Sequence, residues 1–231
     1  MKTVGIIGGI GPESTVEYYR LIIQLYRQQE PRGSYPQIVI NSINMKKMLD
    51  LIRANNLTDV IAYLLEEIRN LARAGADFGL MASNTPHVVF DELLLQSPIP
   101  LISIVDVTCK AAKKQALKNV GLFGTSFTMQ AKFYSDMLNK ADITVILPTS
   151  EEQAYIHDKY MGELVNGILL PETREGLLSI VHRLKVEEMI DGLILGGTEL
   201  PLIMRGAGDQ GIPFLDTTKL HVESVVSMLL T

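Results

Sequence analysis

Small polar residues follow several of the apolar, strand-like runs of this sequence. One group comprises Ser83, Asn84, Thr85, Pro86 and His87. Two further groups comprise Gly196, Gly197, Thr198 and Glu199, and the hydroxyl residues Thr125 and Thr128. Hydroxyls, an amide and free backbone N–H groups at strand ends suit the binding of a small carboxylate. An Asn at a buried strand end needs hydrogen-bond partners, which favours a function for the first group.

A glycine-rich segment, residues 8–15, offers a different kind of binding group. Its glycines allow a tight turn, and Pro12 suits the first position of a helix. The helix start would present free N–H groups near Gly11 together with the Ser14 hydroxyl, which is a candidate anion site. Ordinary turn formation is the alternative. The spacing is not G-x-G-x-x-G and no Gly-Lys-Ser/Thr follows, which excludes the two common nucleotide-binding loops.

Structural roles account for some of the same residues. Thr85 and Thr198 are predicted to cap helices. Glu199 would then complement the positive end of a helix dipole without any catalytic role. His87, considered alone, is better explained as a hydrogen-bonded core histidine.

The elements that must position these groups alternate between strands and helices. Strands are predicted at residues 2–7, 37–41, 78–82, 101–104, 119–123, 143–147, 192–195 and 213–215. Helical periodicity fills the stretches between them; in residues 13–28 it places Val16, Tyr19, Ile23 and Tyr26 on one side. Continuous apolar strands alternating with helices predict α/β architecture, with parallel sheets covered on both faces.

The two halves of the chain repeat weakly. Residues 4–8 match residues 120–124 at an offset of 116, and Ser83 corresponds to Gly197 at an offset of 114. These offsets predict a tandem duplication, with chance similarity as the alternative. We expect one domain of residues 1–102 plus 211–231, closed by the C-terminal helix, and a second of residues 103–210. Facing halves would bring the polar strand ends to one cleft.

Composition and charge argue against several classes of protein, including nucleic-acid-binding, membrane-spanning and zinc-binding proteins. The chain has 231 residues, 47% of them hydrophobic, and a formal net charge of −5. Acidic charge without a basic cluster argues against nucleic acid, and no apolar run is long enough to span a membrane. The single cysteine, Cys109, excludes an internal disulfide and argues against a cysteine-based zinc site. The N-terminal residues lack the arrangement typical of a signal peptide, so we expect a cytoplasmic protein.

The sequence resembles the aspartate/glutamate racemase family, whose members are cofactor-independent amino-acid racemases. The matching pieces are residues 8–15, Asn84 to His87, Gly124-Thr125 with Thr128, Ile156-His157 with Glu163-Leu164 and Gly167, and residues 195–200. They run through nearly the whole chain. The resemblance implies two pseudo-symmetric α/β domains, a homodimer, an amino-acid ligand, no pyridoxal phosphate and no metal.

The resemblance also implies a two-thiol mechanism that this chain lacks. Family racemases place one cysteine on each face of Cα, because inversion needs an acid and a base on opposite sides of one carbon. The two positions here are Ser83 and Gly197. A serine hydroxyl is a weak base without an activating neighbour, and glycine has no side chain.

The expected function is therefore Cα proton transfer on a small acidic amino acid or related carboxylate, by groups other than two thiols. His87 and Glu199 are the candidate replacements. The predicted ligand-binding residues are Gly11, Ser14, Asn84, Thr85, Pro86, Thr125, Thr128 and Thr198. A one-base isomerase or lyase and a non-catalytic carboxylate binder remain alternatives, as does an engineered serine at position 83.

Overall fold

The structure is a computed structural model that describes residues 2–31, 33, 35–204 and 211–231. Its chain divides into two compact units, each of which is described by itself. Unit 1 comprises Met1–Ile104 and His221–Thr231, and unit 2 comprises Val105–Leu220. The second predicted domain boundary, between residues 210 and 211, falls at the edge of the segment outside the described residues.

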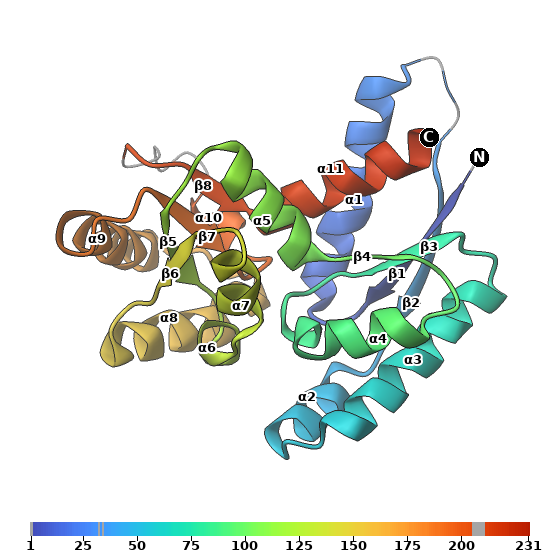
Figure 1. Ribbon diagram of the computed structural model, residues 1–231, viewed down its shortest axis with the longest axis horizontal. Helices are drawn as coiled ribbons and strands as arrows, with labels where there is room; N and C mark the ends of the chain where they lie inside the picture. The colour runs from blue at the N-terminus through green and yellow to red at the C-terminus, as the bar shows by residue number, and fades with distance from the viewer. Residues whose placement is uncertain (1, 32, 34, 205–210) are drawn as a thin grey trace. The chain divides into compact units, whose positions relative to one another are not determined.

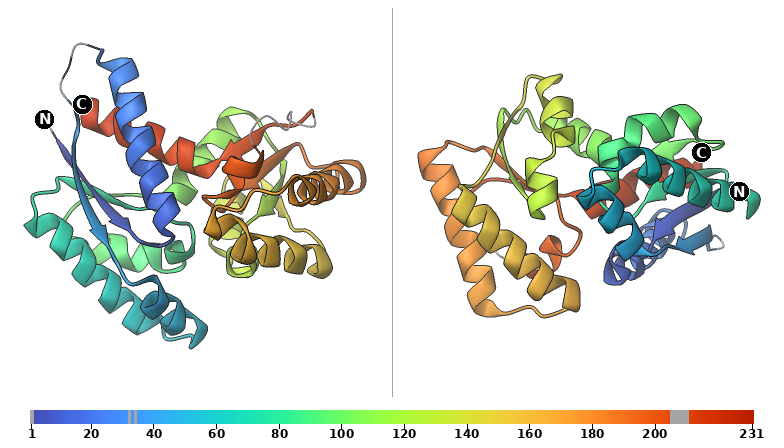
Figure 2. Two further views of the ribbon diagram at one scale, coloured as in Figure 1. Left: turned by 180° about the vertical axis from the view of Figure 1, so that it is seen from behind. Right: turned by 90° about the horizontal axis from the view of Figure 1, so that it is seen from below.

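Unit 1 is built on a parallel sheet with strand order β2-β1-β3-β4. In chain order its elements are β1 (Thr3–Gly8), α1 (Pro12–Gln29), β2 (Gln37–Ser42), α2 (Met45–Arg53), α3 (Leu57–Arg73), β3 (Phe78–Met81), the 3₁₀ helix η1 (Thr85–Val89), α4 (Phe90–Gln96) and β4 (Leu101–Ile102). The last helix, α11 (Thr217–Leu230), begins in unit 2 and ends in unit 1. Figures 1 and 2 show α1 beside α11 and α3 beside α4.

Unit 2 repeats this topology with a parallel sheet of order β6-β5-β7-β8. Its elements are α5 (Ile104–Lys114), β5 (Asn119–Phe123), α6 (Ser126–Gln130), α7 (Phe133–Asn139), β6 (Thr144–Ile146), α8 (Ser150–Gly162), η2 (Leu164–Asn166), α9 (Pro171–Glu187), β7 (Gly192–Leu195), α10 (Leu200–Met204) and β8 (Phe214–Asp216). Figure 2 shows α8 and α9 side by side. The two sheets confirm the predicted α/β fold of two similar parallel-sheet halves.

The central strands form the core of each unit because they are covered on both faces. Every residue of β3 and of β7 is buried, which matches their uninterrupted apolar sequences. In each sheet the strand order reverses between the first and third strands, β1 and β3 or β5 and β7. Ligands of such sheets bind outside the carboxyl ends of the strands at this point.

The apolar residues that periodicity places on one side of α1 differ in burial. The buried apolar residues of this helix are Tyr18, Leu21, Ile22 and Tyr26, whereas Val16 is 62% exposed. Of the predicted side, Tyr26 therefore lies in the core and Val16 does not.

Candidate active site

The turn after β1 shows why this segment is rich in glycine. Gly9 has φ +78°, in the left-handed region, and a Cβ there would lie 2.7 Å from the Ile43 carbonyl oxygen. The Gly9 N–H donates to Thr15 Oγ1 at 2.8 Å, so the first turn of α1 holds the loop in place. The loop thus keeps a shape that larger residues would disturb.

The start of α1 carries two of the predicted binding residues, Gly11 and Ser14. Gly11 occupies the N-cap position without any side-chain cap, and Pro12 follows it. Ser14 is 2% exposed, and within the described part of the chain its hydroxyl has no hydrogen-bond partner. A buried hydroxyl without a partner at a helix start is a place where an anionic group would gain hydrogen bonds.

The strand end after β3 lies next to this loop. The Ala82 N–H donates to the Ile7 carbonyl at 2.9 Å, which keeps the ends of β1 and β3 together. Ser83 and Asn84 follow directly and are 8% and 3% exposed. The predicted cap at Thr85 is wrong by one position, because Thr85 is the first residue of η1 and Asn84 takes the N-cap position without a side-chain cap.

His87 is a core histidine in this structure. Its Nε2 accepts a hydrogen bond from the Ile104 N–H at 3.2 Å, and its ring stacks on Phe90 at a centroid distance of 5.0 Å. Burial and the neighbouring His221 lower the pKa of His87 to about 3, which nearby backbone carbonyls offset only in part. A neutral, packed imidazole with this pKa is a poor acid–base group near neutral pH.

In unit 2, the predicted hydroxyls Thr125 and Thr128 bond to each other. Thr125 caps α6 by accepting from the Thr128 N–H at 3.2 Å, and the two hydroxyl oxygens lie 3.1 Å apart. The pair sits at the end of β5. The Gly196 N–H donates to the Phe123 carbonyl at 2.7 Å, which keeps the end of β7 beside it.

The strongest group of polar side chains in unit 2 surrounds Glu199. The Thr198 hydroxyl donates to Glu199 Oε2 at 2.8 Å, and the Tyr160 hydroxyl donates to the same oxygen. Glu199 is 2% exposed and Tyr160 6%. The predicted cap at Thr198 is wrong, since α10 begins only at Leu200 and the Thr198 hydroxyl bonds the carboxylate instead.

Tyr160 also occupies the space beside Gly197. A Cβ added to Gly197 would lie 2.9 Å from Tyr160 Cζ and 3.1 Å from its hydroxyl oxygen. Position 197 therefore tolerates a side chain only if the tyrosine ring moves. The sequence reasoning missed Tyr160, although it lies inside the segment from Ile156 to Leu164 that carries part of the family resemblance.

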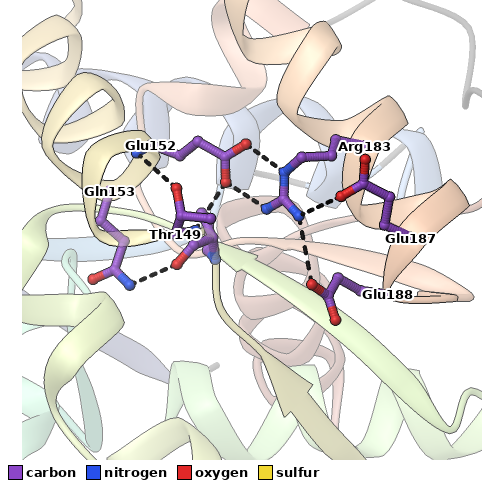
Figure 3. Close-up of polar contacts among 7 residues, drawn as sticks. Thr149, Glu152, Gln153, Arg183, Glu187 and Glu188 are labelled. Carbon is purple, nitrogen blue, oxygen red and sulfur yellow. Dashed lines mark hydrogen bonds and ion pairs between the residues drawn. The ribbon is translucent and has the colours of Figure 1, made fainter.

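Helix α8 brings Tyr160 to this place through contacts at its beginning and middle. Arg183 of α9 donates to both oxygens of Glu152, and Glu152 completes a capping box with Thr149 (Figure 3). Further along α8, His157 Nδ1 accepts from the Ser126 N–H at 3.3 Å. These contacts hold α8 against α9 and against the loop that follows β5.

Metal-ligand groups and membrane-spanning helices are both absent from the described residues. Within the described ranges, no three His, Cys, Asp or Glu side chains are grouped so that they could hold a metal ion. In the same ranges, no helix has the length and apolar character needed to cross a bilayer.

The sequence of this chain is similar to those of known amino-acid racemases. The sequence model of the Asp/Glu/hydantoin racemases matches residues 7–225. The broad-specificity amino-acid racemase RacX of Bacillus subtilis (strain 168) is 25% identical over 98% of both chains.

Solved structures agree with this result. The chain is similar to an aspartate racemase homologue from Pyrococcus horikoshii OT3, with 32% identity, a TM-score of 0.88 and full coverage of both chains. It is also similar to a Yersinia pestis protein described as a candidate Asp/Glu racemase, with 29% identity, a TM-score of 0.91 and full coverage of both chains.

Proposed function

Because the chain belongs to the Asp/Glu/hydantoin racemase family, we propose that it exchanges the proton on Cα of a small amino acid without an organic cofactor. Aspartate and glutamate are the first substrates to test, followed by a wider panel, since RacX is a broad-specificity racemase. The reaction needs a group that accepts the Cα proton and groups that hold the substrate carboxylate.

The observation that carries the proposal is the buried carboxylate of Glu199. It lies just after β7, at the point where the strand order of the unit 2 sheet reverses. Hydroxyl groups of Thr198 and Tyr160 bond its Oε2, so the carboxylate is oriented rather than free to rotate. An oriented carboxylate at a ligand-binding edge is suited to proton transfer.

Unit 1, considered by itself, has groups suited to binding a small anion. The first turn of α1 offers backbone N–H groups and the buried Ser14 hydroxyl, and Asn84 follows β3 on the neighbouring strand. Neutral donors of this kind bind a single negative charge without requiring a basic residue.

We expect slow turnover compared with a two-thiol racemase. Ser83 has a weakly basic hydroxyl, and Gly197 contributes no side chain at all. Since a positioned acid or base typically contributes ~10²–10⁴-fold, the absence of both thiols lowers the rate of inversion by at least that order.

The test is incubation of the purified protein with L-aspartate, L-glutamate and a panel of other amino acids in deuterium oxide. Mass spectrometry measures α-deuterium, and chiral chromatography measures the opposite enantiomer. Glu199→Gln should lower incorporation by ~10²-fold or more. Glu163→Gln is the matched control, because Glu163 is also in unit 2 but its carboxylate oxygens bond Lys159 and Thr173.

The outcomes separate the alternatives. Deuterium in both enantiomers identifies a racemase, and deuterium in one enantiomer identifies one-base exchange. An amino acid that binds, measured by calorimetry, without exchanging its α-proton would contradict the proposal and favour a binding protein.

We also propose that the chain acts as a homodimer in the cytoplasm. Its one cysteine, Cys109, is buried and unpaired, which suits a reducing compartment. An apolar stripe on α1, which includes the exposed Val16 and Tyr19, supplies a surface for self-association.

A further inference from the structure

The phenol of Tyr160 stands where a side chain at position 197 would begin. Gly197 directly follows the buried end of β7 and Gly196, so a side chain there would start at the carboxyl edge of the sheet. The tyrosine ring and hydroxyl oxygen come within 3.1 Å of that starting point. The absence of a Cβ at Gly197 is thus what allows a phenol to reach the strand end.

The same hydroxyl is coupled to a carboxylate. Tyr160 Oη donates a hydrogen bond to Glu199 Oε2, and both side chains are almost fully buried. Thr198 donates to the same carboxylate oxygen at 2.8 Å. A hydrogen bond from a phenol to a carboxylate in a buried site gives the phenol proton a direct path to the carboxylate oxygen.

We propose that Tyr160 and Glu199 form a proton relay in which the Tyr160 oxygen is the atom that takes the proton from the substrate Cα. This inference rests on the proposed function and names its base. Glu199 is the partner that makes the phenol oxygen available.

The step balances within the groups named. The Cα–H bond breaks, and its proton forms a new O–H bond at Tyr160. The proton that Tyr160 held moves to Glu199 Oε2, which becomes a neutral carboxyl group. The electron pair of the Cα–H bond remains on the substrate as a carbanion delocalised into its carboxylate. Reversal of the relay returns a proton to Cα, and exchange of the relay protons with solvent introduces deuterium.

The electrostatics of the pair determine where the proton lies before the reaction. Burial and the charge of Glu199 raise the pKa of Tyr160 well above its ordinary value. The phenol therefore keeps its proton in the resting pair, and its oxygen can take the Cα proton only as its own proton passes to the carboxylate of Glu199, which is the net base. Hydrogen bonds from the Thr198 side chain and the Glu199 backbone partly offset the rise, because they stabilise the phenolate.

The test compares three variants of the full chain by α-deuterium incorporation and by calorimetric binding of the same amino acid. Tyr160→Phe keeps the ring and removes the hydroxyl, and it should lower exchange by ~10²-fold or more while binding persists. Glu199→Gln should lower it similarly. Tyr134→Phe is the matched control: Tyr134 is fully buried in the same unit, its hydroxyl bonds Thr108, and its removal should leave the rate unchanged.

A fourth variant guards against a folding defect in Tyr160→Phe. Replacing Tyr160 with 3,5-difluorotyrosine keeps the ring and hydroxyl but makes the phenol more acidic. The pH profile of exchange should then move to lower pH, which a purely structural hydroxyl would not cause.

Each outcome decides one question. Exchange by the native chain, its loss in Tyr160→Phe and a shifted fluorotyrosine profile would support the relay. Exchange by the native chain that Tyr160→Phe retains, or a profile that fluorination leaves unmoved, would overturn the relay alone. No exchange by the native chain with any amino acid would overturn the proposed function, and the relay with it.

Discussion

The Tyr18 hydroxyl lies 2.9 Å from Nδ1 of His221 and joins α1 to α11. His221 Nε2 is 3.0 Å from the carbonyl oxygen of Ile102, which can only accept, so Nε2 carries the proton and Nδ1 accepts from the tyrosine. Both ring nitrogens are therefore satisfied by the neutral imidazole. The His87 ring lies 6.4 Å away, so two neutral histidines share this part of the unit 1 core.

Stability should fall with acidification between pH 6.5 and pH 5. Burial lowers the pKa of His221 to about 4 and, with the neighbouring His221, lowers that of His87 to about 3. The unfolded chain binds protons below about pH 6.5 that the folded chain does not, so the free energy of unfolding decreases as pH falls through this window. The expected loss is on the order of 2 kcal/mol per histidine by pH 5.

Urea denaturation at pH 7 and pH 5 measures this loss. His87→Gln and His221→Gln should each flatten the pH dependence, even if they lower stability at pH 7. His182→Gln, in α9 of unit 2, provides the control. Equal pH dependence in all three variants would show that the buried pair does not control acid stability.

The bidentate contact between Arg183 and Glu152 should stabilise unit 2 more than an exposed ion pair would. Arg183 Nε lies 2.6 Å from Glu152 Oε1, and the Arg183 hydrogen bond is the main reason that the pKa of Glu152 is lowered. Lysine cannot form two parallel hydrogen bonds. We expect Arg183→Lys to cost about 1–2 kcal/mol in thermal or chemical unfolding.

Arg20→Lys is the comparison for that prediction. Arg20 also makes two hydrogen bonds to one carboxylate, that of Glu17, but its side chain is 52% exposed and both residues lie on α1. Its replacement should cost no more than ~0.5 kcal/mol. Similar costs for the two variants would mean that joining α8 to α9 adds nothing.

Introducing thiols at positions 83 and 197 should require a third change. Ser83→Cys replaces oxygen by sulfur with little change in volume. Gly197→Cys brings a side chain against the Tyr160 ring, which must give way. We expect the double variant to racemise poorly, and addition of Tyr160→Leu to raise racemisation by about tenfold or more, since a second acid–base group then reaches its place.

Chiral chromatography with aspartate and glutamate checks the prediction, with calorimetry to confirm ligand binding. Ser83→Cys with Tyr160→Leu, which lacks the second thiol, is the control. A double variant as active as the triple variant would show that Tyr160 does not obstruct position 197.

Self-association should involve the exposed apolar stripe of α1. Val16 is 62% and Tyr19 49% exposed, and Ile23 continues the stripe at helical spacing. We expect light scattering to give the mass of a dimer, and Val16→Lys with Tyr19→Lys to shift it toward the monomer. Leu95→Lys on α4, where Leu95 is 86% exposed, should leave the mass unchanged. A native monomer would refute the dimer.

The sequence predicted the strands well because their signals are local. Residues 119–123 and 192–195 are strands with the predicted bounds, and in the structure the two strands pair in parallel. The core-facing side of α1 could not be predicted in the same way. The helix carries two apolar stripes, one through Val16 and Tyr19 and one through Tyr18 and Ile22, and periodicity alone does not say which of them meets the sheet.

The candidate site was only partly predictable. Glu199 and Thr198 adjoin in sequence, so a polar group at the end of β7 could be predicted. Tyr160 reaches Glu199 across a separation of 39 residues, and only the packing of α8 brings them together. Gly197 was identified through the repeat and the family resemblance, but the meaning of its missing side chain depends on what fills the space.

The path of the chain through the two units has a consequence for synthesis on the ribosome. Unit 2 is one continuous stretch, whereas unit 1 needs its last segment, residues 221–231, including His221 and its bond to Ile102. Unit 2 can therefore fold as soon as it emerges, whereas unit 1 is complete only after residues 221–231 have emerged. Unit 1, whose first residues are translated before those of unit 2, is therefore the last of the two units to complete its fold.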